Sequence, residues 1–147
     1  MPTGYRFRMA QTVEEIMTRD PRTVDASDTI VDAARVMRDS DIGDVVVMED
    51  GRVSGIVTDR DIVVRGVAEG RDPDSTAVSE VCTTGVETID PSASVDDALG
   101  LMREKDIRRL PVTKNGRPVG IISLGDLAVE REPDSTLADI SAASPDQ

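Results

Sequence analysis

The hydrophobic pattern of the first half of the chain predicts a helix followed by a β-hairpin. Apolar side chains recur with the i, i+3, i+4 and i+7 spacing of one helix face at Ile30, Ala33, Ala34 and Met37. Two mostly apolar runs, 45–48 and 53–57, then flank an Asp50-Gly51 pair. Because Asp-Gly favours the tight turn of a hairpin, we expect these runs to be paired, buried strands.

Hydroxyl residues mark the start of two more helices. Thr12 and Glu15 have the spacing of a capping box, which predicts a short helix ending near Met17. Thr58 follows the second strand of the hairpin and predicts a helix that continues to about Val67. With a short extended segment before the central helix, the order is short helix, strand, helix, hairpin, helix.

The same pattern then occurs a second time. Residues 13–62 align without a gap on residues 78–127 after a shift of 65 positions, the difference between Gly120 and Gly55. Identical residues at this shift include Thr18/Thr83, Asp25/Asp90, Ala33/Ala98, Met37/Met102, Ile42/Ile107, Gly51/Gly116 and Asp61/Asp126. Such self-similarity indicates duplication of one supersecondary unit. We therefore expect an α/β (α+β) fold in which two β-α-β-β-α repeats pack sheet to sheet with pseudo-twofold symmetry.

These patterns divide the chain into five expected segments. An N-terminal tail covers 1–11, and the first repeat covers 12–68. A polar, turn-rich linker follows at 69–77, and the second repeat covers 78–130. The proline-, serine- and acid-rich residues 131–147 form a C-terminal tail that we expect to be partly disordered.

The two repeats should use the same core positions. The helix face of the second repeat is formed by Val95, Ala98, Leu99 and Met102. Its hairpin turn, Asn115-Gly116, is an even stronger turn signal than Asp50-Gly51. Cys82 occupies the position that Met17 has in the other repeat, so we expect a small buried apolar side chain rather than a redox thiol.

Composition and charge exclude several classes of function. The chain has 17 basic and 29 acidic residues, and the resulting net charge of −12 disfavours nucleic acid or an anionic membrane as a partner. A single cysteine and the absence of histidine argue against an internal disulfide and against a zinc or haem site. No apolar run has the length of a signal peptide core or a membrane span, so we expect a cytoplasmic protein.

Candidate chemistry lies where the last strand of each repeat meets a helix. A hydroxyl residue ends the strand and an aspartate follows three positions later, as Thr58/Asp61 and Ser123/Asp126. The N–H groups and positive dipole end of a helix N-terminus suit a phosphate, and the adjacent carboxylate suits a sugar hydroxyl. The same spacing is also an ordinary capping box, a purely structural device, and both roles can hold at once.

The closing motif of the repeats resembles that of a known family. Each repeat ends on Gly-hydrophobic-hydrophobic-(Ser/Thr)-x-x-Asp. The segments Asp106–Val112 (Asp-Ile-Arg-Arg-Leu-Pro-Val) and Thr58–Ile62 (Thr-Asp-Arg-Asp-Ile) are similar to the most recurrent signatures of CBS domains. The resemblance covers about Val13 to Leu127. In layout the chain resembles a stand-alone tandem CBS pair, similar to the small hypoxic-response CBS proteins of actinobacteria.

The resemblance implies a regulatory module that holds an adenosine ligand such as AMP, ADP or ATP, sometimes S-adenosylmethionine or NAD, in two clefts between the repeats. Asp61 and Asp126 would then accept hydrogen bonds from ribose hydroxyls, and Thr58 and Ser123 would contact phosphate. The residues implied around the base are Thr18, Arg22 and Ile42 for one cleft, and Thr83, Glu87 and Ile107 for the other. No obligatory cofactor is implied, and magnesium would bind only through a nucleotide phosphate.

Charge distinguishes the two expected clefts. Arg108 and Arg109 precede the strand in the second repeat, where the first repeat has Gly43 and Asp44, and the resemblance assigns a phosphate contact to Arg109. The charged and polar groups expected at each cleft are Ser123, Arg109 and Arg22 beside Asp126, and Asp44, Glu87 and Arg60 beside Asp61. Where the second repeat has Arg109, which would attract a phosphate, the first repeat has Asp44, which would repel it. We therefore predict tighter nucleotide binding in the cleft at Asp126 than in the cleft at Asp61.

Three functions remain open on the sequence alone. The first is a nucleotide sensor that acts through a homodimer on an unidentified regulated protein, and the apolar residues Val63, Val64 and Val67 favour such a dimer. The second is a structural or interaction scaffold with degenerate, unoccupied sites, which Asp44 and Glu87 favour. The third is an enzyme, which the lack of histidine and of a nucleophile paired with a base disfavours.

Overall fold

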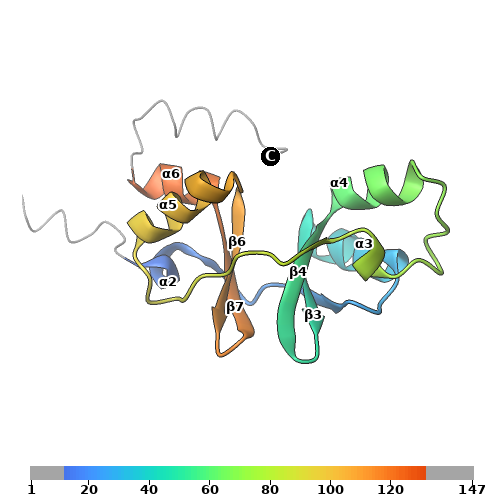
Figure 1. The fold of residues 1–147 in the computed structure, drawn as a ribbon, viewed down its shortest axis with the longest axis horizontal. Coiled ribbons are helices and arrows are strands. Elements are labelled where there is room, and N and C mark those ends of the chain that lie inside the picture. Colours follow the sequence, from blue (N-terminus) through green and yellow to red (C-terminus); the bar gives the residue numbers. More distant parts are fainter. Residues whose placement is uncertain (1–11, 132–147) are drawn as a thin grey trace, which may run out of the picture. The chain divides into compact units, whose positions relative to one another are not determined.

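The computed structural model describes residues 12–131, which form two units with separate sheets and cores (Figure 1). Among the described residues, unit 1 contains 12–19, Thr88–Lys114 and 119–131. Unit 2 contains Asp20–Glu87 and Asn115–Pro118. The predicted tail 1–11, and all of the predicted tail 131–147 except Arg131, lie outside the described residues.

Unit 2 is built on a four-stranded mixed sheet with the strand order β2-β3-β4-β5. β2 is parallel to β3, and the other neighbours are antiparallel. Its strands are β2 (Thr23–Asp25), β3 (Asp44–Glu49), β4 (Arg52–Thr58) and β5 (Thr83–Thr84). Its helices are α3 (Ile30–Ser40), α4 (Asp59–Asp61), the π-helix η1 (Ile62–Val67) and the 3-10 helix η2 (Val78–Glu80). The helix predicted from Thr58 to Val67 is therefore a short α-helical turn that continues as a π-helix.

Unit 1 repeats this plan with a three-stranded sheet of order β1-β7-β6. Its strands are β1 (Thr18–Arg19), β6 (Arg109–Lys114) and β7 (Arg117–Ser123). Its helices are α2 (Val13–Ile16), α5 (Val95–Lys105) and α6 (Leu124–Arg131). The two hairpins predicted from sequence are thus β3–β4 and β6–β7, which are both labelled in Figure 1.

Both hairpin turns have the backbone conformation that their sequences predict. In the β3–β4 turn, φ is 54° at Asp50 and 78° at Gly51. In the β6–β7 turn, φ is 56° at Asn115 and 81° at Gly116. Two successive positive φ angles match the right-handed twist of the strands on either side, which explains why Asp-Gly and Asn-Gly occupy these positions.

Each sheet receives its edge strand from the beginning of the other sequence repeat. β1, at the start of the first repeat, pairs with β7 through Thr18/Ile121 and Arg19/Gly120. β5, at the start of the second repeat, pairs with β4 through Thr83/Ile56 and Thr84/Gly55. These pairings provide hydrogen-bond partners for backbone N–H and C=O groups at the edges of β4 and β7, which would otherwise be unpaired. The compact units therefore do not coincide with the sequence repeats.

The predicted core faces of the two central helices are confirmed with one exception. Val95, Ala98, Leu99 and Met102 are all buried in unit 1, and Ile30, Ala33 and Met37 are buried in unit 2. Ala34 is exposed, so its assignment to the core face was wrong. It is equivalent to Leu99, whose longer side chain reaches the core where an alanine methyl group does not. Val36, on the opposite side of the face, packs against the core instead.

Cys82 is a buried core residue of unit 2, as its position in the repeat predicts. Only 7% of it is exposed. Burial raises the pKa of the Cys82 thiol, and the nearby carboxylate of Asp61 raises this pKa further. A thiol in this environment remains protonated at neutral pH and reacts slowly, which agrees with a packing role.

Candidate functional site

The strand-to-helix corner of unit 2 contains a closed capping box between Thr58 and Asp61. The Thr58 N–H donates to Asp61 Oδ2 at 2.9 Å, and the Asp61 N–H donates to Thr58 Oγ1 at 3.0 Å. The corner is also held to the start of β3, because the Asp59 N–H donates to the Gly43 carbonyl oxygen at 3.0 Å. Thr58 and Asp61 are both half-buried, so the hydroxyl and carboxylate have fixed positions.

The corner of unit 1 has the same hydrogen bonds. The Ser123 N–H donates to Asp126 Oδ2 at 3.3 Å, and the Asp126 N–H donates to Ser123 Oγ at 3.1 Å. The Leu124 N–H donates to the Arg108 carbonyl oxygen at 2.7 Å. Ser123 is half-buried, and Asp126 is exposed. The structural role predicted for both motifs, helix capping, is therefore present in both units.

Capping uses only part of each carboxylate. In both boxes the N-cap N–H reaches Oδ2, and no described residue donates a hydrogen bond to Oδ1 of Asp61 or Asp126. An ionised carboxylate has about four acceptor sites. Each corner consequently offers an acceptor oxygen beside a helix N-terminus, the combination that suits a ribose hydroxyl next to a phosphate.

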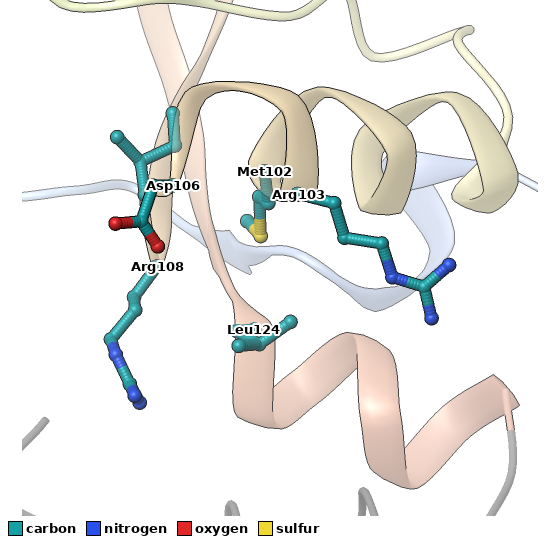
Figure 2. Close-up of a pocket in the computed structure, with 6 residues that line it drawn as sticks. Met102, Arg103, Asp106, Arg108 and Leu124 are labelled. Atoms are coloured by element: carbon teal, nitrogen blue, oxygen red, sulfur yellow. The ribbon is translucent and has the colours of Figure 1, made fainter.

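A pocket of about 260 Å³ lies beside the unit 1 corner, between the end of α5 and the start of α6 (Figure 2). It is lined by Met102, Arg103, Asp106, Ile107, Arg108 and Leu124. Figure 2 shows the side chains of Arg103 and Arg108 extending on either side of Leu124. Two of the lining residues, Ile107 and Arg108, were predicted from sequence.

Arg103 and Asp106 were not predicted as site residues. Arg103 lies on the polar face of α5, where the sequence pattern indicates only solvent exposure. Asp106 follows the last residue of α5 and has a left-handed backbone, with φ 54°. The tendency of aspartate to adopt this conformation at helix ends is the one signal that marks its position.

Ile42 and Ile107 have equivalent places at the ends of the central helices. Each follows a left-handed aspartate, and its N–H donates to a helix carbonyl oxygen, that of Met37 at 3.0 Å or that of Met102 at 2.9 Å. Each is half-buried and packs against the core of its own unit. Their backbone positions are thus determined by the helix ends.

The remaining predicted residues are distributed over the two units. Unit 1 contains Thr18, Ile107, Arg108, Arg109, Ser123 and Asp126. Unit 2 contains Arg22, Ile42, Gly43, Thr58, Arg60, Asp61, Thr83 and Glu87. Thr18 and Thr83 belong to the exchanged edge strands, and the Arg22 guanidinium donates to Ser40 Oγ at 3.1 Å.

The charges around the two corners differ as the sequence predicts. In unit 1, Arg109 is the first residue of β6 and Arg108 comes directly before it. In unit 2, Asp44 is paired with Thr58 across the β3–β4 ladder. The Asp59 carboxylate lies next to Gly43, with Oδ2 only 3.1 Å from the position that a Cβ would occupy. The unit 2 corner therefore carries three carboxylates, those of Asp44, Asp59 and Asp61, where unit 1 offers two arginines.

Comparison with known sequences decides the family. The sequence profile of the CBS domain matches residues 13–66 and 78–131, which together cover most of the chain. The chain belongs to the CBS domain family. CBS domains are generally regulatory, ligand-binding and non-catalytic modules, and they typically bind adenosine ligands. The two corners described above are the last strand-to-helix junction of each CBS domain.

Curated relatives align with most of this chain. This CBS protein is 42% identical over 120 residues to CBS domain-containing protein YhcV of Bacillus subtilis, covering 82% of the chain and 85% of the relative. It is 36% identical over 118 residues to Hypoxic response protein 1 of Mycobacterium tuberculosis, covering 80% of the chain and 82% of the relative.

Solved structures confirm the fold. The crystal structure of Hypoxic Response Protein I with two coordinated zinc ions has a TM-score of 0.71 at 36% identity, covering 80% of this CBS chain and 96% of that chain. A hexameric CBS-CP12 protein from bloom-forming cyanobacteria has a TM-score of 0.72 at 30% identity, covering 94% and 85%. In residues 12–131 of the present protein, no group of three or more cysteine, aspartate or glutamate residues could hold a metal ion. Among the described helices, none is long and apolar enough to cross a membrane.

Proposed function

We propose that this CBS pair is a non-catalytic regulatory module that senses adenine nucleotides of the AMP, ADP and ATP class at its strand-to-helix corners. The observation that carries the proposal is the paired capping box, Thr58/Asp61 and Ser123/Asp126, which leaves Oδ1 of each aspartate without a donor among the described residues. A ribose has hydroxyl donors for that oxygen, and its phosphate matches the adjacent helix N-terminus.

The unit 1 corner should bind the nucleotide more tightly. Its helix α6 has eight residues, whereas α4 has three before the helix changes to π geometry. Arg108 and Arg109 add two positive charges at the start of β6. At the other corner, Asp44 and Asp59 add negative charges that oppose a phosphate. An arginine-to-aspartate difference at a few ångströms is worth roughly 1 to several kcal/mol at an effective dielectric near 20.

Ligand-dependent thermal unfolding of the full chain tests the proposal. A nucleotide at about 100 times its dissociation constant adds roughly 2.7 kcal/mol of stability. AMP, ADP or ATP should therefore raise Tm by several degrees, and cytidine nucleotides at the same concentration should not. The double variant Asp61→Ala/Asp126→Ala should lose the response. If no adenosine compound shifts Tm, the sensor is excluded and a scaffold with degenerate sites becomes the better description.

The π-helix η1 supports a homodimer as the form that transmits the signal. Three valines on this helix are exposed, with relative accessibilities of 57% at Val63, 43% at Val64 and 62% at Val67. Apolar side chains clustered on one exposed helix mark an interaction surface. A second copy of the chain would cover this surface and link ligand occupancy in one copy to the position of the other.

Charge introduced on this helix should break the dimer. We expect the double variant Val63→Asp/Val67→Asp to change from dimer to monomer in light scattering at micromolar concentration, because a carboxylate is costly to bury in an apolar contact. Both side chains are exposed in the isolated chain, so the circular dichroism spectrum should be unchanged. A wild-type protein that is already monomeric under these conditions would contradict the dimer.

A further inference from the structure

A second pocket in unit 1 lies at the hairpin end of the sheet, away from the nucleotide corner. Its volume is about 430 Å³, and Val119 near the start of β7 forms part of its lining. Ser123 ends the same strand four residues later, which corresponds to ~13 Å. We name this site the charged pocket, defined by Glu14, Arg19, Asp90 and Lys114 together with the apolar residues Met17 and Val119.

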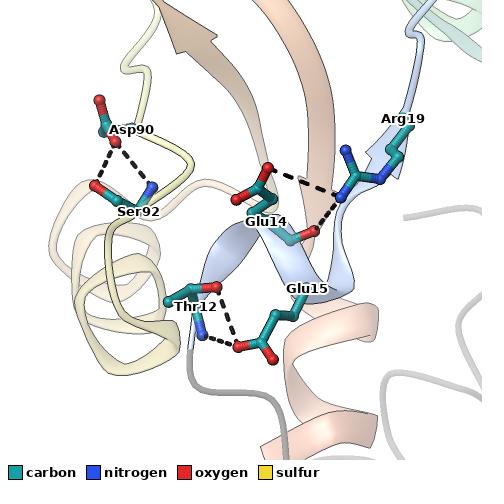
Figure 3. A network of polar contacts seen from close by, with 6 residues as sticks. All are labelled: Thr12, Glu14, Glu15, Arg19, Asp90 and Ser92. Atoms are coloured by element: carbon teal, nitrogen blue, oxygen red, sulfur yellow. Dashed lines mark hydrogen bonds and ion pairs between the residues drawn. The ribbon is translucent and has the colours of Figure 1, made fainter.

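Arg19 enters the charged pocket from β1, and the residues that the structure describes engage it only weakly. Its Nη2 lies 3.9 Å from Glu14 Oε2 and donates to the Glu14 carbonyl oxygen at 3.4 Å, both long contacts (Figure 3). The side chains are 62% and 55% exposed, so the ion pair contributes little to stability. A guanidinium has five N–H donors. Most of the donor capacity of Arg19 is thus available to a ligand.

Asp90 and Lys114 provide the second pair of opposite charges. Asp90 Oδ1 accepts from the Ser92 N–H at 2.8 Å and from the Ser92 hydroxyl at 2.6 Å, which leaves Oδ2 without a donor among the described residues (Figure 3). These two hydrogen bonds, and to a smaller degree the charge of Lys114, lower the pKa of Asp90. Its carboxylate is therefore ionised at neutral pH. No described carboxylate lies within ion-pair distance of the Lys114 ammonium group.

The equivalent positions in unit 2 show which residues of the charged pocket the fold itself requires. The aspartate turn recurs there, because Asp25 Oδ2 accepts from the Ser27 N–H at 2.9 Å and from its hydroxyl at 2.5 Å. At the shift of 65 positions, however, Arg19 is replaced by Thr84 and Lys114 by Glu49. The same fold therefore forms without either cation. Their presence in unit 1 is a property of this pocket and not a requirement of the CBS fold.

We propose that the charged pocket binds a free α-amino acid with an apolar side chain. Its four charges, two of each sign, sum to zero within a chain of net charge −12. A simple anion would meet Glu14, Asp90 and the negative field of the protein, and a simple cation would meet Arg19 and Lys114. A zwitterion satisfies both signs at once, with its carboxylate on the cations and its ammonium group on the carboxylates.

The remaining lining determines the side chain of this ligand. Met17 and Val119 form an apolar part of the pocket wall, which suits an aliphatic or thioether side chain. The volume of about 430 Å³ lies within the range of roughly 300 to 1,000 Å³ that is usual for small-molecule sites. Leucine and methionine combine both features, and they are the probes we choose.

Titration calorimetry of the full chain with L-leucine and L-methionine tests the proposal. We expect saturable binding at one site, weakened about tenfold by Arg19→Thr and about tenfold by Lys114→Glu, the residues that unit 2 carries at these positions. N-acetyl-leucine lacks the ammonium group and leucinamide lacks the carboxylate, so both should bind at least about tenfold more weakly than leucine. Arg35→Thr, which removes an exposed arginine of α3, should leave the affinity unchanged.

Two variants distinguish amino-acid binding at the charged pocket from nucleotide binding at the corners. Asp126→Ala should retain amino-acid binding, and Lys114→Glu should retain the response to adenine nucleotide. Both Arg19 and Lys114 are exposed, so the variants should keep the circular dichroism spectrum of the wild type. The proposal is overturned if neither amino acid binds, if N-acetyl-leucine binds as well as leucine, or if both variants bind with wild-type affinity.

Discussion

Asp126→Ala should weaken adenine-nucleotide binding by about tenfold or more, and by more than Asp61→Ala does. The substitution removes the acceptor for a ribose hydroxyl at the corner where Arg108 and Arg109 add positive charge. The unit 2 corner, which is intact in this variant, has the Asp44 carboxylate opposite Thr58. This negative charge opposes a phosphate, so the unit 2 corner binds the nucleotide less tightly. Titration calorimetry of the two variants with the same nucleotide gives the order directly. Tighter binding to Asp126→Ala than to Asp61→Ala would reverse our assignment of the stronger site.

The chain contains a matched control for this experiment. Thr29 and Asp32 form another capping box of the same kind, with hydrogen bonds of 3.0 and 3.2 Å, at the start of α3. Asp32→Ala removes the same cap without touching either strand-to-helix corner. Both Asp32→Ala and Asp126→Ala should lower the free energy of unfolding by about 1 kcal/mol, the usual contribution of a cap. A loss of nucleotide affinity confined to Asp126→Ala then reports a ligand contact and not a loosened helix.

Gly55→Ala should be the most destabilising single substitution considered for this protein, with a loss of about 3 kcal/mol in the free energy of unfolding. A Cβ at Gly55 would collide with the carbonyl oxygen of Thr83 in the neighbouring strand β5, and would lie 3.2 Å from the Thr83 carbonyl carbon. Because the Thr83 carbonyl belongs to the backbone, a side-chain rotation cannot relieve this collision. β5 must move away from β4, and the edge pairing that the second repeat supplies to unit 2 is lost.

Two other glycines calibrate the measurement by urea unfolding. Gly120 is the equivalent of Gly55, but the nearest obstacle there is the flexible side chain of Met17, followed by the Thr18 carbonyl oxygen at 2.9 Å. Gly120→Ala should therefore cost less than Gly55→Ala. Gly100 lies on α5, and an added Cβ would meet nothing within 4 Å, so Gly100→Ala should stabilise by about 0.5–1 kcal/mol. Equal unfolding free energies for Gly55→Ala and the wild type would show that β5 is not held as described.

Local patterns were sufficient to predict most elements and much of the candidate site. Capping residues located the starts of the helices, Asp-Gly and Asn-Gly located both turns, and apolar spacing located the cores. Each of these signals reports an interaction within a few residues of the chain. The same locality explains the errors. Spacing placed Ala34 on the core face, but only the packed structure shows that its side chain is too short to be buried there.

The sequence by itself determined the duplication, the two capping boxes and the excess of positive charge at the second one, because all three follow from residue identity and spacing. Only the tertiary structure decided that the two repeats exchange their first strands, as the Thr18/Ile121 and Thr83/Ile56 pairs show. It also decided that Arg19 and Lys114, 95 positions apart in the chain (114 − 19), line one pocket. The physical reason is that two similar repeats offer each open sheet edge two similar partner strands. The local sequence pattern shows that a sheet edge needs a partner strand. Long-range packing determines which of the two similar strands pairs with that edge.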